Sequence, residues 1–210
     1  MLTRFRIVMM DVSNGVMTAV PKSGDSRAPI NQFWRMRKHV TPDYTDIVRV
    51  SSNSLWSVVV IDLDKEPLVV SHPDTNGRFI IIQLMNMWTD HFGSIGSRAT
   101  GTGGGNFLVA GPKWNGAPPP DVKDIYRSAT RYGWILVQIA SKGPEDYAVV
   151  NVLQDQLKIT PLSAWGKPYT PPDNVPVDPT VDTETDPFNQ LRLMDAETFP
   201  YTIPPLRRVD

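Results

Sequence analysis

Hydrophobic residues in the middle of the chain are grouped in short runs that predict β-strands. The runs are rich in β-branched and aromatic residues, and we expect strands at residues 55–63, 67–72, 78–88, 106–111 and 133–140. Three residues separate the first two, and the tight-turn sequence Asn76-Gly77 precedes the third. Because parallel neighbours need a crossover of about a dozen residues, the first three strands are predicted to be adjacent and antiparallel.

Helical spacing of hydrophobic residues occurs in two other places. Near the N-terminus, one stripe is formed by Phe5, Val8, Met9, Val12 and Val16, which predicts an amphipathic helix. A second helix is predicted near residues 144–158, because Pro144 suits a first helical position and Pro161 follows as a stop. Its inward face would carry Tyr147, Val150, Leu153, Gln154 and Leu157.

These elements predict an α+β fold that is rich in β-structure, with an antiparallel, sandwich-like core. We expect one domain over residues 1–165. Seven prolines lie between residues 161 and 187, so residues 166–210 are predicted to form an extended, acidic, proline-rich segment.

Composition narrows the possible functions. The 210 residues include no cysteine, which excludes disulfides, thiolate nucleophiles and cysteine-bound zinc. The formal net charge of −1 argues against a nucleic-acid-binding protein. A basic cluster beside Phe33 and Trp34 (Arg35, Arg37, Lys38 and His39) is a candidate for single-stranded nucleic acid, but a surface turn is the favoured interpretation.

The chain shows no sequence sign of a membrane segment or a signal peptide. No hydrophobic run approaches the roughly 20 residues that cross a bilayer. The run Ile7–Met10 is too short for a signal core, and Asp11 interrupts it. We expect no membrane association and, by default, a cytoplasmic location.

A glycine-rich stretch raises the question of phosphate binding. Residues 96–112 contain six glycines. In a P-loop, Lys and Ser/Thr would follow Gly101, but Thr102 and Gly103 stand there, and a strand-like sequence comes next instead of a helix. We therefore predict a mobile hairpin corner.

The remaining chemistry gives few candidates. The histidines, His39, His72 and His91, have no metal-ligand spacing, so no metal or cofactor is expected. No nucleophile motif accompanies His91, and no catalytic residue is assigned. Arg98, between two glycines, and Arg78, after the Asn-Gly turn, suit recognition of a carboxylate or phosphate, although pairing with an aspartate is the more ordinary role.

Three longer segments carry a resemblance to a known family. They are "DLDKEPLVVSHPDTNGRF", "WTDHFGSIGSRATGTGGGNFLVAGPKWNG" and "GPEDYAVVNVLQDQLKITPL". Together they resemble the bacterial family called domain of unknown function 1254 (DUF1254), over roughly residues 7–172. "MDAETF" is similar to the linker that leads, in longer relatives, to a companion domain of unknown function 1214. The resemblance implies a β-rich domain, and relatives are often exported.

The resemblance also singles out candidate site residues. Positions that match the family pattern are Arg78, Trp88, Thr89, Arg98, Thr100 and Gly101. Relatives carry Asp where this chain has Asn53, and Arg where it has Gln138. An aspartate can act as a base or bind metal, whereas an asparagine can only form hydrogen bonds. A charged pair of the family would thus be neutral here.

We expect a non-catalytic β-rich module that pairs with a second β domain or another copy and holds a small organic ligand. The candidate ligand-binding residues are Asn53, Arg78, Trp88, Thr89, Arg98 and Thr100. A first alternative is a small-molecule hydrolase or lyase with a site around Arg78, Thr89, His91 and Arg98. A second alternative is a truncated remnant without activity of its own.

Overall fold

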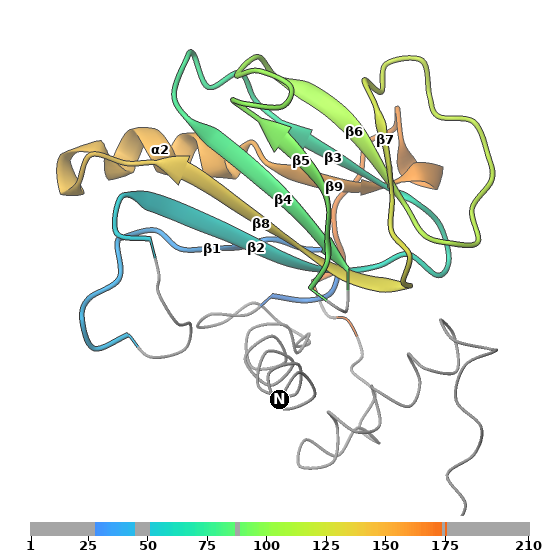
Figure 1. Ribbon diagram of the computed structural model, residues 1–210, viewed down its shortest axis with the longest axis horizontal. Helices are drawn as coiled ribbons and strands as arrows, with labels where there is room; N and C mark the ends of the chain where they lie inside the picture. Colours follow the sequence, from blue (N-terminus) through green and yellow to red (C-terminus); the bar gives the residue numbers. More distant parts are fainter. Residues whose placement is uncertain (1–27, 45–50, 87–88, 174, 176–210) are drawn as a thin grey trace, which may run out of the picture.

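Two packed β-sheets form the body of the protein. The computed structural model describes residues 28–44, 51–86, 89–173 and 175. One sheet has the strand order β1 (Trp34–Arg35), β2 (Ser54–Asp62), β8 (Tyr132–Ala140), β4 (Ile80–Asn86), β5 (His91–Gly96). The other has the order β7 (Ile125–Arg127), β6 (Gly105–Ala110), β3 (Leu68–His72), β9 (Lys158–Pro161). In Figure 1 the sheets overlap, with the helix α2 (Tyr147–Asp155) beside them. The predicted β-rich, sandwich-like α+β class is confirmed.

The core lies between the inner faces of the two sheets. Alternate residues of the strands point inward, as the period of two requires. Fully buried members include Leu55 and Ile61 from β2, Ile80, Ile82 and Leu84 from β4, Leu68 and Val70 from β3, Phe107 and Val109 from β6, and Ile135, Val137 and Ile139 from β8. Tyr147, Val150 and Leu153 of α2 pack against the same cluster, so this helix extends the core.

The prediction that the first three strands are adjacent and form hairpins is wrong. β2 pairs with β1 and β8, β3 pairs with β6 and β9, and β4 pairs with β5 and β8. The short links after β2 and after β3 therefore pass from one sheet to the other. A short connection excludes parallel pairing, but it can equally span the roughly 10 Å between packed sheets. One pair, β6 with β7, is parallel.

Four strands lie outside the predicted set. β5 has the sequence HFGSIG, whose glycines and serine hide the β pattern, and it exists through pairing with β4. β1, β7 and β9 have two, three and four residues, too few to show a period. Such strands are defined by their neighbours and not by their own composition.

The predicted helix near residues 144–158 is shorter than expected. It begins with a 3-10 turn, η1 (Pro144–Asp146), continues as α2 and ends at Asp155. Leu157 is buried after the helix, and Lys158–Pro161 forms β9 against β3. Pairing of the β-branched Ile159 and Thr160 with β3 overrides the helical pattern. A second 3-10 turn, η2 (Leu162–Ala164), follows.

The expected N-terminal helix lies outside the described residues, as does most of the predicted extension 166–210. The division at residue 165 stays a prediction. No helix in the described ranges is long and apolar enough to span a bilayer.

The glycine-rich stretch is a corner, as predicted, although not a hairpin. It leads from β5 in one sheet to β6 in the other, and no helix follows it. Gly96 has φ 116°, and a Cβ there would lie 2.3 Å from the carbonyl oxygen of Ile80, so only glycine fits.

Candidate functional site

A hollow of about 720 Å³ is the candidate site. It lies where the turn before β4 meets the end of β8 and the helix α2. Its lining includes the predicted residues Asn53 and Arg78, together with Lys142, Phe79 and Val149. The volume falls within the range of small-molecule sites, roughly 300–1,000 Å³.

The Asn-Gly turn forms one wall of this hollow. Asn76 and Gly77 have φ values of 51° and 79°, the positive values that the sequence predicts for a tight turn. The amide of Arg78 donates to the carbonyl of Thr75 at 3.0 Å, and the Thr75 hydroxyl donates to the carbonyl of Arg78 at 2.6 Å. The backbone that carries Arg78 and Phe79 is therefore fixed.

Arg78 pairs with Asp146, which agrees with the expectation that an arginine here pairs with an aspartate. Its guanidinium donates to both carboxylate oxygens, at 2.5 and 2.8 Å, and to the carbonyl of Ala140 at 2.8 Å. These bonds from Arg78, reinforced by the backbone amide of Lys142 at 3.0 Å, lower the pKa of the Asp146 carboxyl. The pair is mostly buried, so it joins β4 to the start of η1 and α2 in a fixed geometry.

Hydrogen-bond donors remain free at the hollow. Among the described residues, neither the Nε–H of Arg78 nor the Lys142 ammonium has an acceptor. Asn53 accepts a hydrogen bond from Ser51 through Oδ1 at 2.7 Å, which leaves its amide NH₂ to donate. Asp74 is the carboxylate of the lining, and its Oδ1 accepts the amide of Asn76 at 2.7 Å.

Exposed hydrophobic side chains surround these donors. Phe79 is 40% exposed and Val149 is 54% exposed, and Leu153 completes the apolar wall. Single exposed apolar side chains are common on protein surfaces, so what singles these out is that they lie together in one hollow with the polar donors.

Asn53 and Gln138 belong to one hydrogen-bonded chain. Ser51 donates to Asn53, and the single hydroxyl hydrogen of Ser54 is shared between Ser51 Oγ at 2.9 Å and Gln138 Oε1 at 3.3 Å. Two serine hydroxyls thus stand between the two amides, and no charge is left without a partner.

The other predicted site residues do not meet at the hollow. Arg98 and Thr100 lie in the corner after β5, where the Thr100 hydroxyl accepts the amide of Gly96 at 2.9 Å. Thr89 and His91 lie at the far end of β4, a seven-residue strand about 20 Å long. The four residues of the hydrolase alternative therefore do not form one site. Trp88 lies outside the described residues.

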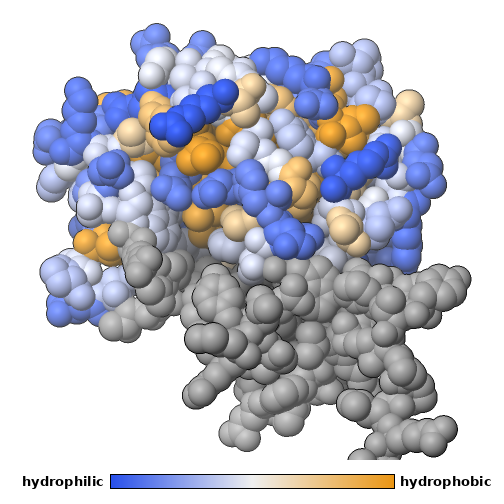
Figure 2. Space-filling view, in the orientation of Figure 1, coloured by the Kyte–Doolittle hydropathy of each residue, from blue (hydrophilic) through white to orange (hydrophobic). Residues whose placement is uncertain are grey.

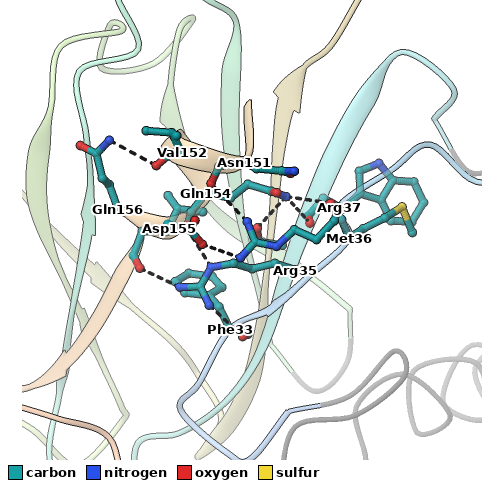
Figure 3. A network of polar contacts seen from close by, with 12 residues as sticks. Phe33, Arg35, Met36, Arg37, Asn151, Val152, Gln154, Asp155 and Gln156 are labelled. Atoms are coloured by element: carbon teal, nitrogen blue, oxygen red, sulfur yellow. Dashed lines mark hydrogen bonds and ion pairs between the residues drawn. The ribbon is translucent and has the colours of Figure 1, made fainter. Parts of the chain in front are cut away.

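Two arginines of the basic cluster, Arg35 and Arg37, bind the end of α2 (Figure 3). Arg35 donates to the carbonyls of Gln154 and Leu157 at 2.9 and 3.2 Å. Arg37 donates to the carbonyl of Asn151 at 3.2 Å and forms an ion pair with Asp155. The last carbonyls of a helix lack internal partners and carry partial negative charge, so cations there stabilise it. This role was missed because α2 is more than 100 residues away in sequence.

The same contact region contains a fully buried glutamine. Gln154 donates through Nε2 to the carbonyls of Met36 and Trp56 at 3.1 and 2.7 Å, which fastens α2 to β2 and the segment after β1 (Figure 3). Sequence spacing put Gln154 on the inward face of the helix, and its burial confirms that prediction.

Metal binding finds no support in the described residues, which contain no group of three or more His, Asp or Glu side chains able to hold an ion. His72 is buried beside Phe107, with ring centroids 5.7 Å apart, and its Nδ1 lies 2.9 Å from the carbonyl of Pro73. Burial lowers the pKa of His72, so it favours the neutral imidazole.

Comparison with solved structures gives two matches, of which the first shares the fold. The structure of the VPA0106 protein of Vibrio parahaemolyticus matches with a TM-score of 0.58 and 23% identity, over 88% of this chain and 46% of that protein. An uncharacterized protein from Burkholderia cenocepacia matches with a TM-score of 0.39 and 11% identity, over 94% of this chain and 49% of the other. This chain thus spans about half the length of each. A search of curated proteins gives no significant match.

The sequence profile of one family covers more than half of the chain. It is described as a protein of unknown function (DUF1254), and it matches residues 30–161, from the segment before β1 to the end of β9. Its span includes the turn that carries Arg78, the corner after β5, the 3-10 turn that carries Asp146, and the helix α2, whose Val149 lines the hollow. The protein is therefore a member of the DUF1254 family.

Proposed function

We propose that this domain is a non-catalytic binding module that holds a small organic molecule in the hollow between the Asn76-Gly77 turn, β8 and α2. The observation that carries the proposal is the combination of exposed Phe79 and Val149 with unpaired donors of Arg78 and Lys142. A concave surface with an apolar wall and a few convergent polar groups is the usual form of a ligand site.

The arrangement favours binding over catalysis. Arg78 is held by Asp146, whose lowered pKa makes it a poor base near neutral pH. No nucleophile with a neighbouring base lines the hollow. The ion pair instead gives a rigid base on which a ligand can rest without reorganisation of the protein.

A fragment screen tests this proposal. Amide resonances of the ¹⁵N-labelled protein would be followed while a chemically mixed set of small acids, amines, alcohols and aromatic compounds is added. We expect at least one class to shift the amides of Arg78, Phe79 and Val149. If no class shifts them, while the protein stays folded, the hollow is not a ligand site.

The second candidate is pairing with another β layer, favoured by the outer face of the five-stranded sheet. The strand register sets Val60 beside Trp134 and Trp134 beside Met85, and it sets Val58 beside Leu136. Figure 2 shows hydrophobic patches between hydrophilic residues over this region. An outer sheet face exposed to water is usually polar at these positions, whereas here Val58 and Met85 are buried and Val60, Trp134 and Leu136 are half-buried.

Sedimentation tests pairing between copies of the chain. The wild type should associate as its concentration rises, and Leu136→Lys should remain monomeric because it puts a charge into the contact. Ala117→Lys, at an exposed position of the loop between β6 and β7 of the other sheet, is the control for added charge. If the wild type stays monomeric at every concentration, the face does not pair with another copy of the chain, and its partner would have to be a different β domain.

A further inference from the structure

The chemistry of the hollow also selects a class of ligand. We propose that it binds a small carboxylic acid with an alkyl or aryl body, an inference that rests on the ligand-binding function proposed above. The acid group would accept hydrogen bonds at the Arg78 and Lys142 side, and the body would lie on Phe79, Val149 and Leu153.

The first support is that Arg78, Lys142 and Asn53 all offer hydrogen-bond donors to the hollow, whereas the acceptor Asp74 lies on the other side of the Asn76-Gly77 turn. Guanidinium and ammonium groups have no acceptor atoms, and Asn53 uses its carbonyl oxygen for Ser51. A ligand that faces Arg78, Lys142 and Asn53 must therefore bring acceptor oxygens. A carboxylate brings two, in a geometry that suits a guanidinium edge.

The second support is the local charge. Asp146 forms two hydrogen bonds with Arg78 and also attracts the nearby Lys142 ammonium, but Lys142 forms no direct ion pair within the described part of the chain, so its ammonium is the cation that a ligand can contact. Asp74 carries the opposing charge, but it lies before the Asn-Gly turn and is bonded to the amide of Asn76. A single negative charge on the ligand matches Lys142, whereas a phosphate dianion would exceed what one ammonium offsets.

The third support is the size of the apolar wall. Phe79 and Val149 are both exposed, and covering them with a hydrocarbon of a few carbons releases water from both. Charge alone at an exposed lysine gives little affinity, so the hydrocarbon contact has to supply much of the binding energy.

The test compares two probes that differ only in the charged group, 3-phenylpropionate and 3-phenylpropanol, by ¹⁵N NMR titration of the full chain. The propionate should shift the amides of Arg78, Phe79, Lys142 and Val149 and should bind more tightly than the alcohol. Lys142→Met should weaken the propionate about three- to fivefold, the range expected for an exposed ion contact, and leave the alcohol unchanged.

The apolar contact has a matched pair of variants. Val149 and Val152 are both exposed valines of α2, at 54% and 59%, but only Val149 lines the hollow. Val149→Ser should weaken both probes about fivefold through loss of partly buried hydrocarbon, whereas Val152→Ser should leave them unchanged.

The outcomes separate the two proposals. If alcohols or amines shift the hollow as strongly as the acid, and Lys142→Met has no effect, the carboxylic acid is wrong while the ligand site stands. If neither the two probes nor the mixed fragment set shifts the hollow, both proposals are wrong. If the propionate binds but Val152→Ser weakens it as much as Val149→Ser, its binding surface is elsewhere on α2 and the assignment to the hollow is overturned.

Discussion

Arg78 and Asp146 lie 68 residues apart in the sequence and meet through two hydrogen bonds of 2.5 and 2.8 Å. Arg78 follows the Asn-Gly turn before β4, and Asp146 closes the 3-10 turn that starts α2. The contact gives the hollow a rigid base and at the same time joins the helix to the five-stranded sheet. Stability and binding are therefore connected at this pair.

Breaking this pair should destabilise the fold. Arg78→Met leaves the mostly buried Asp146 carboxylate without its cation, and we expect the free energy of unfolding in urea to fall by about 2 kcal/mol. The double variant Arg78→Met/Asp146→Leu should lose less than the two single variants summed, because neither charge is then stranded. The matched exposed pair is Lys113–Asp64, where Lys113→Met should cost at most about 0.5 kcal/mol. Additive losses at residues 78 and 146 would show that they are not coupled.

Gly93 should tolerate no side chain. A Cβ at this position would lie 2.3 Å from Cδ1 of Tyr126, whose hydroxyl donates to the carbonyl of Ser94 at 3.1 Å and so links the edges of the two sheets. Gly93→Ala should lower the free energy of unfolding by about 2 kcal/mol through overpacking.

Gly103 provides the control for this substitution, because nothing lies within 4 Å of a Cβ built there. Gly103→Ala should be close to neutral in the same urea titration. Tyr126→Leu should recover part of the loss in the Gly93→Ala background. Equal effects of the two alanine substitutions would contradict the assigned contact.

Arg35 should stabilise α2 from outside the helix. Arg35→Met removes donors to the carbonyls of Gln154 and Leu157, and we expect a loss of about 2 kcal/mol together with faster amide hydrogen exchange in the last turn of α2. Lys38→Met, which replaces an exposed cation three positions beyond β1, should change neither quantity. If amide hydrogen exchange in α2 is the same in Arg35→Met as in the wild type, Arg35 does not cap the helix.

His72 should make the protein less stable in mild acid. Burial holds the pKa of His72 below the ordinary value of 6.5, so the unfolded chain takes up a proton first as the pH falls. Stability due to this residue is complete above about pH 7.5 and should decline through pH 6, with a slope of at most about 1.4 kcal/mol per pH unit.

His72→Gln should flatten this decline when the free energy of unfolding is measured between about pH 7.5 and 5.5. His91→Gln, which replaces an exposed histidine, controls for the loss of an imidazole and should keep the wild-type slope. If His72→Gln keeps the wild-type slope of unfolding free energy against pH, other groups cause the pH dependence.

Much of the fold was open to prediction from local patterns. The β-branched runs around Val59, Val70 and Ile82 marked three strands, and the Asn76-Gly77 step marked a turn with positive φ. Strands such as β5 escaped because glycine and serine carry no β signal, and Lys158–Pro161 was assigned to the helix because periodicity alone does not register a partner strand.

The candidate site was open to prediction only in part. Arg78 and Asn53 could be singled out from the family pattern, and both line the hollow. Lys142 and Val149 could not, because an exposed lysine and an exposed helical valine have no distinctive local sequence. The capping role of Arg35 could not be predicted either, since its acceptors are carbonyls about 120 residues away in the sequence.

The sequence by itself determined five of the nine described strands, the Asn76-Gly77 turn and the start of the helical segment at Pro144, because those preferences depend on neighbouring residues and their φ, ψ and packing tendencies. Only the tertiary structure decided which strands pair, since a link of a few residues suits both a hairpin and a passage between two sheets. It also decided which charges meet. The partner of Arg78 was set by the packing of α2 against the sheets, which brings together groups that no local pattern relates.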